Sequence, residues 1–266
     1  MIQLLGIPYD KNSSFQTGSA LAPPRIRLMA SDGSANLYSE GGLKITENKL
    51  YNDLGDLQFE DKAPAAVFNQ IRNKVSTILE KPARLISLGG DHSVSYPVID
   101  AHTDLYENLH VLHFDAHGDL YENYDNNPYS HASPFARLME AGKVQSLTQI
   151  GVRALTAHQW EQAEKYGVNI VEMRNFNTDF LDNLKGPLYI SIDLDVLDPA
   201  FAPGISHHEP GGLSSRELLN MIQQINVPVV GADIVEYNPV RDIHYMTAMV
   251  AWKLFKEVVH LMHRNS

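Results

Sequence analysis

The sequence contains no cysteine among its 266 residues. A disulfide framework and any metal site built on thiolates are therefore excluded. The opening segment, MIQLLGIPYD, has no basic start before its short apolar run, so we expect neither a signal peptide nor a transit peptide. No apolar run reaches the roughly 18 residues that a membrane span needs. We accordingly expect a cytoplasmic protein.

Positive charge is also scarce. Lysine and arginine together number 21 against 32 acidic residues, which gives a formal net charge of −11. A chain this acidic argues against a nucleic-acid partner, whereas it is compatible with a small cationic ligand. Hydrophobic residues make up 44% of the sequence, enough for a sizeable core. We expect one domain that spans residues 1–266.

Short apolar runs alternate with helical patterns along the chain. Several runs are continuously apolar, as expected for strands that are covered on both faces. The alternation predicts an α/β fold with a mostly parallel sheet. The expected strands are Ile2–Ile7, Arg84–Leu88, His110–Phe114, Leu147–Val152, Val168–Val171, Leu188–Ile192 and Val227–Ile234. The expected helices are Ala65–Leu79, Pro134–Ala141, Ala157–Tyr166, Ser215–Gln224 and Tyr245–His263.

Acids and histidines gather where four of the expected strands end. Because parallel strands end at the same edge of a sheet, four loops would bring these side chains to one crevice, where open α/β sheets place their ligands. One such motif alone is more often a polar loop, but their shared position is hard to explain as coincidence. The four groups are Gly89–Ser93 (GGDHS), Asp115–Asp119 (DAHGD), Asp193–Asp195 (DLD) and Glu236.

So many carboxylates in one crevice would repel one another unless a divalent cation lay among them. Imidazole and carboxylate ligands without sulfur suit Mn²⁺, Zn²⁺, Fe²⁺ or Ni²⁺, and the excess of oxygen favours Mn²⁺. Alternation in Asp115-x-His117-x-Asp119 points the odd residues to one side of an extended segment. Six ligands exceed the needs of one tetrahedral ion. Two ions that share carboxylates and activate a water as nucleophile fit better.

The motifs GGDHS, HFDAHGD, SIDLDVLDPAFAPG and VEYNP, in this order, resemble those of the ureohydrolases, the family of arginases and agmatinases. The resemblance runs from GIPYD near the start to Asn238-Pro239. It implies a three-layer α/β/α fold and a binuclear manganese centre. It also implies hydrolysis of a guanidino group to urea and an amine, by a homo-oligomer that is a trimer or a hexamer.

The resemblance also implies a role for each residue of the motifs. Two residues would bind one ion, two would bind the other, and two would bridge both: His92 and Asp119, His117 and Asp195, and Asp115 and Asp193. Glu236 would pair with the guanidinium group of the substrate, since an anion suits a planar cationic fork. His131 and Asp119 would move protons toward the leaving amine.

The sequence departs from the family pattern at two places. ISHHEPGGL stands where a stretch such as TGTPEPGGL is usual, which puts His207 and His208 near the expected crevice. These histidines would either alter substrate choice or pack the loop. Gly118 stands in the metal loop where threonine is common, although every ligand is intact.

The substrate tail would be read by loops, chiefly Leu120–Ser130 and Val152–His158. The first loop has acids and amides but no lysine or arginine, which suits a cationic or neutral tail. Arg153 would either bind a carboxylate or serve the structure. The motif wording favours agmatine. Open alternatives are arginine, guanidinobutyrate, guanidinopropionate and formimidoylglutamate, a binuclear phosphoesterase or peptidase, and a metal-bound scaffold without catalysis.

Overall fold

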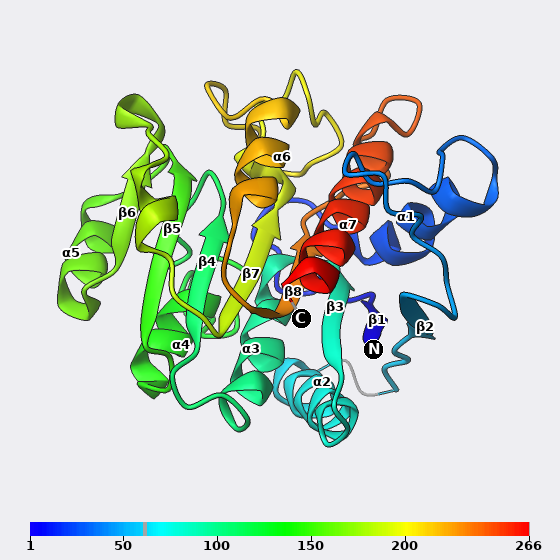
Figure 1. Cartoon of the computed structure of the whole chain (residues 1–266). Helices are drawn as coiled ribbons and strands as arrows, with labels where there is room; N and C mark the ends of the chain where they lie inside the picture. Colours follow the sequence, from blue (N-terminus) through cyan, green and yellow to red (C-terminus); the bar gives the residue numbers. More distant parts are fainter. Residues whose placement is uncertain (61–62, 266) are drawn as a thin grey trace.

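Eight strands form one sheet in the computed structural model, which describes residues 1–60 and 63–265 (Figure 1). The strand order across the sheet is β2-β1-β3-β8-β7-β4-β5-β6, and every neighbouring pair is parallel. The strands are β1 (Ile2–Ile7), β2 (Tyr51–Asp56), β3 (Arg84–Gly89), β4 (His110–Phe114), β5 (Ser146–Val152), β6 (Asn169–Glu172), β7 (Leu188–Asp193) and β8 (Val229–Val235).

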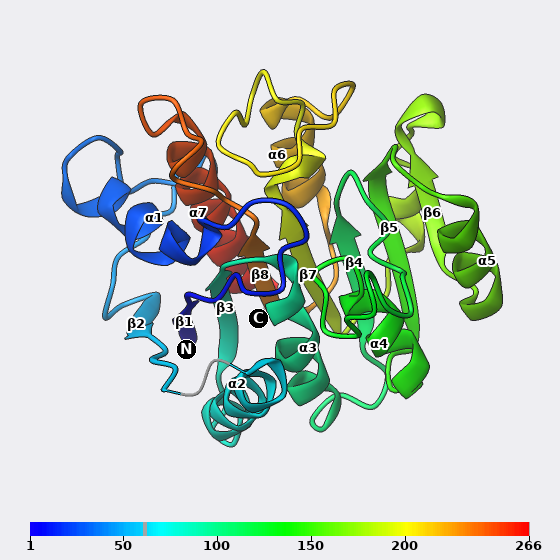
Figure 2. The same cartoon turned by 180° about the vertical axis from the view of Figure 1, so that it is seen from behind.

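Helices cover both faces of this sheet (Figures 1 and 2). On one face α1 (Ala22–Ser31), α6 (Ser215–Gln224) and α7 (Met246–Arg264) pack onto one apolar cluster. On the other face a second cluster joins α2 (Pro64–Leu79), α3 (Ser95–Thr103), α4 (Pro134–Ala141) and α5 (Ala157–Tyr166). Successive residues of a strand contribute side chains to opposite clusters, because side chains alternate between the two faces of the sheet. The predicted three-layer α/β/α fold is thereby confirmed.

All seven expected strands are present, with ends that differ by at most two residues. The edge strand β2 was not expected. Its sequence, YNDLGD, contains only two large apolar residues, and β2 lies at the edge of the sheet, where one side of the strand has no neighbour. Strand propensity from composition is weak at such an edge. The register with β1 places β2 in the sheet.

The five expected helices are also present, whereas α1 and α3 were not expected. Both contain proline near the N-terminal end, where the missing N–H is tolerated. Pro23 and Pro24 lie in the first turn of α1, and Pro97 is the third residue of α3. Among the described residues, no helix combines the length and apolarity needed to cross a membrane.

Candidate metal centre and active site

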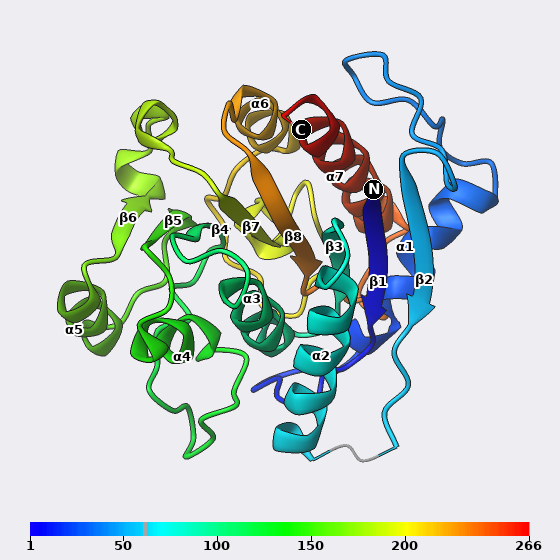
Figure 3. The same cartoon turned by 60° about the horizontal axis from the view of Figure 1, so that its bottom comes forward.

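The four motif loops leave four adjacent strands in the middle of the sheet. In the order β3-β8-β7-β4 these strands end at Gly89, Val235, Asp193 and Phe114. Figure 3 shows the sheet with its helices from another side. The expected gathering of acids and histidines at one edge is therefore what the parallel order produces.

Two groups of metal-ligating side chains meet at Asp115. One comprises His92, His113, Asp115 and Asp119, and the other Asp115, His117 and Asp195. In the first group, Nδ1 of His92 lies 3.2 Å from Oδ2 of Asp115 and 3.2 Å from Oδ2 of Asp119. In the second, Nδ1 of His117 lies 3.0 Å from Oδ2 of Asp195. Since one carboxylate is common to both groups, the arrangement fits two neighbouring ions.

Asp193 lies with the first group. Its Oδ2 is 3.1 Å from Nδ1 of His92, while its Oδ1 accepts the backbone N–H of Asp195 at 2.8 Å. The geometry thus shows a shared carboxylate directly at Asp115. A bridging role for Asp193 stays a prediction.

His113 is a neighbour of the cluster with both ring nitrogens engaged. The amide nitrogen of Gln149 donates to the carbonyl of Gly118 at 2.6 Å and lies 3.0 Å from Nδ1 of His113. An amide oxygen could not lie so close to that carbonyl, so the amide also donates to His113. Nε2 of His113 then carries a proton and donates to Asp115 at 2.8 Å. His113 therefore orients Asp115, in agreement with its omission from the expected ligands.

The electrostatics of the cluster call for added positive charge. Burial, with Asp195 and Asp115 as neighbours, holds the pKa of Asp193 well above its usual value. Burial and the charge of Asp115 raise the pKa of Asp195 to about 6. Burial also opposes the charged form of Asp115, but its contacts with three imidazoles outweigh this and lower its pKa. Divalent cations would stabilise all of these carboxylates in the ionised form.

Two site residues adopt a left-handed backbone conformation. The φ angles are 49° at Asp119 and 63° at Glu236. Such conformations cost about 1–3 kcal/mol for a residue other than glycine and persist where the surroundings impose them. At Glu236, the backbone N–H donates to the carbonyl of Gly90 at 2.9 Å, which ties the end of β8 to the loop after β3.

Glu236 and His131 form a buried pair. Nδ1 of His131 donates to Oε1 of Glu236 at 2.7 Å, and the same oxygen accepts the backbone N–H of His92 at 2.9 Å. Burial disfavours the imidazolium, but the Glu236 charge outweighs it and raises the pKa of His131 to about 9. Burial disfavours the ionised form of Glu236, but the charge of His131 and its hydrogen bond outweigh this and lower the pKa of Glu236. Nε2 of His131 lies 2.8 Å from the hydroxyl of Ser14.

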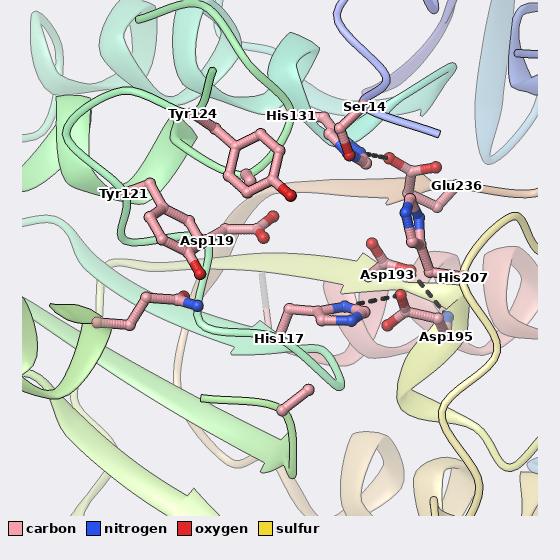
Figure 4. A pocket seen from close by; sticks show the side chains of 13 residues that line it. Ser14, His117, Asp119, Tyr121, Tyr124, His131, Asp193, Asp195, His207 and Glu236 are labelled. Atoms are coloured by element: carbon pink, nitrogen blue, oxygen red, sulfur yellow. Dashed lines mark hydrogen bonds and ion pairs between the residues drawn. The ribbon is translucent and has the colours of Figure 1, made fainter. Parts of the chain in front are cut away.

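A cavity of about 190 Å³ opens onto both the cluster of metal-ligating side chains and the pair of Glu236 and His131 (Figure 4). It is small beside the roughly 300–1,000 Å³ of pockets for drug-sized ligands, so it suits a small substrate. His207 lines the cavity, with its ring 5.3 Å from that of His131 and 6.0 Å from that of His117. His208 instead donates to the carbonyl of Pro203 at 2.9 Å on the surface. Only the first of the two unusual histidines therefore faces the site.

The outer part of the cavity is lined by neutral side chains. Tyr121 and Tyr124 come from the loop expected to read the substrate tail, with ring centroids 5.1 Å apart. Ala154 and the buried Gln159 complete this side, and these four residues are called the outer wall below. Arg153 serves the structure, because its guanidinium group donates to the backbone carbonyls of Gly151, Asp195, Val196, Leu197 and Glu209.

Close packing explains why glycine occupies position 118. A Cβ at this position would lie 2.6 Å from the side chain of Leu155 and 2.9 Å from Oε1 of Gln159. A larger residue would have to displace both neighbours. The departure from the family's threonine is thus matched by the side chains around it.

Several residues of the site were not expected from the sequence. Ser14 contacts His131 from the N-terminal loop, and nothing in its local sequence signals this. Ser191 and Gln149 lie within strands, where a polar residue in an apolar run was the available signal. A buried polar residue requires a hydrogen-bond partner, and only the tertiary structure shows which one it has.

Comparisons with known proteins agree with this geometry. The sequence model of the Arginase family matches residues 1–260. The chain is 46% identical to Arginase 1, mitochondrial, from Arabidopsis thaliana over 96% of its own length and 79% of the relative. It is 35% identical to Agmatinase from Bacillus subtilis (strain 168), over 96% and 90% of the two chains. The solved arginase from Medicago truncatula superposes with a TM-score of 0.94 at 43% identity, covering 98% of this chain and 87% of the other. The chain therefore belongs to the arginase family of hydrolases, which cleave C–N bonds of guanidino groups.

Proposed function

We propose that the buried cluster holds two Mn²⁺ ions. His92 and Asp119 would bind one ion, His117 and Asp195 the other, and Asp115 and Asp193 both. The support is the proposed set of six ligands, which comprises four aspartates and two histidines and no sulfur. Ni²⁺, Fe²⁺ and Zn²⁺ rank lower on the same ground. A bound pair of divalent cations would activate water as the nucleophile.

Glu236 would bind the guanidinium group of the substrate. Both donors to its carboxylate go to Oε1, and nothing in residues 1–60 and 63–265 donates to Oε2. The side chain lines the cavity, so Oε2 is available to accept from a substrate N–H. A charge-assisted hydrogen bond of this kind is about twice as strong as a neutral one.

His131 and Asp119 would move protons for the reaction. The raised pKa of His131 keeps its imidazole charged near neutral pH, so it can donate a proton to the leaving amine and regain one from solvent. Asp119 lines the same cavity and provides a carboxylate that can accept a proton from the attacking water. Both side chains are drawn among the residues that line the cavity in Figure 4.

Agmatine is the substrate that the cavity geometry favours. The observation that carries this proposal is the neutral, tyrosine-containing outer wall together with the engaged Arg153 guanidinium. An ammonium tail can interact with the faces or hydroxyls of Tyr121 and Tyr124. A carboxylate tail would find neither an unengaged lysine nor an unengaged arginine among the lining residues.

L-Arginine is the second candidate. The observation in its favour is the higher identity to plant proteins named arginase, at 46%, than to the Bacillus agmatinase, at 35%. Its α-ammonium group could use the same tyrosines, but its α-carboxylate would depend on the neutral donors Ser14 and Gln159. The two substrates therefore differ in one group that the outer wall must accept or reject.

The test is a comparison of kcat/KM for urea release by the Mn²⁺-loaded protein. Agmatine, L-arginine and n-butylguanidine share the guanidino end and a chain of four carbons, and differ in the tail. We expect agmatine to exceed both others by at least tenfold. A higher value for L-arginine would establish the second candidate. Equal values for agmatine and n-butylguanidine would contradict recognition of the tail charge.

The panel is extended with guanidine, guanidinobutyrate, guanidinopropionate and formimidoylglutamate, the last assayed by formamide release. A preference for any of these over agmatine would also contradict the proposal. Repetition with Ni²⁺ separates a wrong substrate from a wrong metal.

A further inference from the structure

A chain of hydrogen bonds runs from His92 into the sheet, away from the cavity. Nε2 of His92 lies 3.0 Å from the hydroxyl of Ser191. That hydroxyl donates to Oδ1 of Asp233 at 2.6 Å, and Oδ2 of Asp233 accepts from the hydroxyl of Tyr189 at 2.8 Å. All four side chains are fully buried. Ser191 is the first residue of the SIDLDVLDPAFAPG motif, whereas Tyr189 and Asp233 lie outside the quoted motifs, and none of the three is among the expected metal ligands.

The register of the sheet builds this chain. Ser191 on β7 lies directly opposite Asp233 on β8, and it is two residues before Asp193 on the same side of β7. Tyr189 reaches Asp233 across Gly231, where any Cβ would lie 2.7 Å from the tyrosine ring. The carboxylate is therefore held beneath the metal cluster by the backbone pairing of two central strands.

The donor and the acceptor of each hydrogen bond between His92, Ser191 and Asp233 can be assigned. The Ser191 hydroxyl has a single hydrogen, which it gives to Asp233. Its oxygen can then only accept from His92, so Nε2 of His92 carries a proton. In the neutral imidazole the lone pair is consequently on Nδ1. This is the nitrogen that lies 3.1–3.2 Å from the carboxylates of Asp115, Asp119 and Asp193.

We propose that Ser191 and Asp233 are positioning residues that fix the tautomer and ring orientation of His92, so that Nδ1 is the metal-binding atom. The proposal rests on the proposed metal centre. It assigns the two residues no contact with substrate. Partners of this kind typically change metal affinity by roughly 10- to 100-fold when they are removed.

The test compares Mn²⁺ binding to the full chain by equilibrium dialysis in wild type, Ser191→Ala and Tyr189→Phe. Ser191→Ala breaks the chain between His92 and Asp233. Tyr189→Phe is the matched control, because it removes the other donor to the same carboxylate at the same depth and leaves the Ser191 link intact. Circular dichroism and thermal unfolding show whether each variant is folded.

For wild type we expect two bound ions per chain. In Ser191→Ala one ion should bind roughly 10- to 100-fold more weakly, while the other keeps its affinity, and Tyr189→Phe should bind both as wild type does. Ser191→Ala with wild-type affinity at both sites, or an equal loss in Tyr189→Phe, would overturn the proposal. Fewer than two bound ions in wild type would overturn the proposed binuclear centre, and with it the positioning role of Ser191 and Asp233.

A second measurement does not depend on whether a variant folds. In ¹⁵N-labelled wild type loaded with diamagnetic Zn²⁺, long-range NMR correlations report the state of each imidazole nitrogen. We expect His92 to show a protonated Nε2 and a metal-bound Nδ1. A metal-bound Nε2 would contradict the proposed role of Ser191.

Discussion

At the scale of single residues, the site contains a residue with a strained backbone and a carboxylate oxygen that has no hydrogen-bond donor. Glu236 has a positive φ and a buried carboxylate, yet only one of its oxygens has donors within the described chain. The positive φ costs stability, and so does a buried carboxylate oxygen without a donor. A ligand that donates to the second oxygen would remove the latter cost. The residue is therefore the most direct place to test substrate binding.

Glu236→Gln should leave the metal ions bound and reduce kcat/KM. An amide in place of the carboxylate removes a hydrogen bond to a charged group, which is worth about 1.5–3 kcal/mol, or roughly 10- to 150-fold. Steady-state kinetics and metal analysis of one preparation check both statements. Glu107→Gln, at an exposed acid between α3 and the start of β4, controls for the change in net charge. Unchanged kcat/KM in Glu236→Gln would remove this residue from the guanidinium contact.

His131 should make stability depend on pH. Its folded-state pKa of about 9 lies above the ordinary value of 6.5. Its stabilising contribution is thus complete below about pH 6.5 and is lost as pH rises through 9. At 1.36 kcal/mol per pKa unit, the full effect is about 3 kcal/mol.

The measurement is urea unfolding of metal-free wild type and His131→Asn between pH 6.5 and 9.5. The difference in the free energy of unfolding should shrink as pH rises. Ser14→Ala removes the other partner of the imidazole without removing a charge, so its effect should not vary with pH. A difference between wild type and His131→Asn that stays constant across this range would contradict a charged imidazole.

At the scale of elements, the site depends on how tightly the loop after β3 approaches its neighbours. A Cβ at Gly90 would lie 1.9 Å from the backbone carbonyl of Tyr9. The Gly90 carbonyl also accepts the backbone N–H of Glu236. The close approach of these backbones is therefore part of what positions Glu236 and His92.

Gly90→Ala should reduce both stability and activity. Overpacking of this kind typically costs about 1–3 kcal/mol, and the displaced loop would move Glu236. Chemical denaturation and kinetics of the folded fraction measure the two effects. Gly142→Ala is the control, since Gly142 ends α4 in a left-handed conformation with open space around it. It should lose about 1–2 kcal/mol of stability but keep its activity. Full activity in Gly90→Ala would contradict the positioning argument.

At the scale of the whole molecule, the metal centre links folding to ligand binding. The cluster lies at the ends of four adjacent strands from both halves of the sequence, so only the folded chain brings its ligands together. Ions bound at the proposed site would therefore stabilise the folded state. The predicted homo-trimer or homo-hexamer and the expected cytoplasmic location stay predictions, because the structure of a single chain shows neither.

Removal of metal should lower the melting temperature. At a free ion concentration of 100 times Kd, each site contributes about 2.7 kcal/mol, which corresponds to several degrees for a chain of this size. Thermal unfolding with chelator, and again after Mn²⁺ is restored, measures the effect. Asp115→Ala lacks the shared carboxylate, so chelator should change its melting temperature much less. Equal melting temperatures of wild type with and without Mn²⁺ would contradict a structural contribution from the ions.

The sequence by itself determined the residue types of the site and their place at the ends of strands. Apolar runs followed directly by acids and histidines carry that information locally, because the period of the side chains and the chemistry of the ligands are both short-range. The sequence did not predict strand β2 or helices α1 and α3. An edge position weakens the local signal of the strand, and prolines near the N-terminal ends weaken that of the helices.

Only the tertiary structure decided which groups meet. It placed Asp115 in both ligand groups, turned His207 toward the cavity and His208 toward solvent, and engaged Arg153 with backbone carbonyls. It also set Ser191 opposite Asp233 through the register of two strands that are 36 residues apart in the chain, counted from the end of β7 to the start of β8. Such partners depend on strand order and register, which no local pattern encodes.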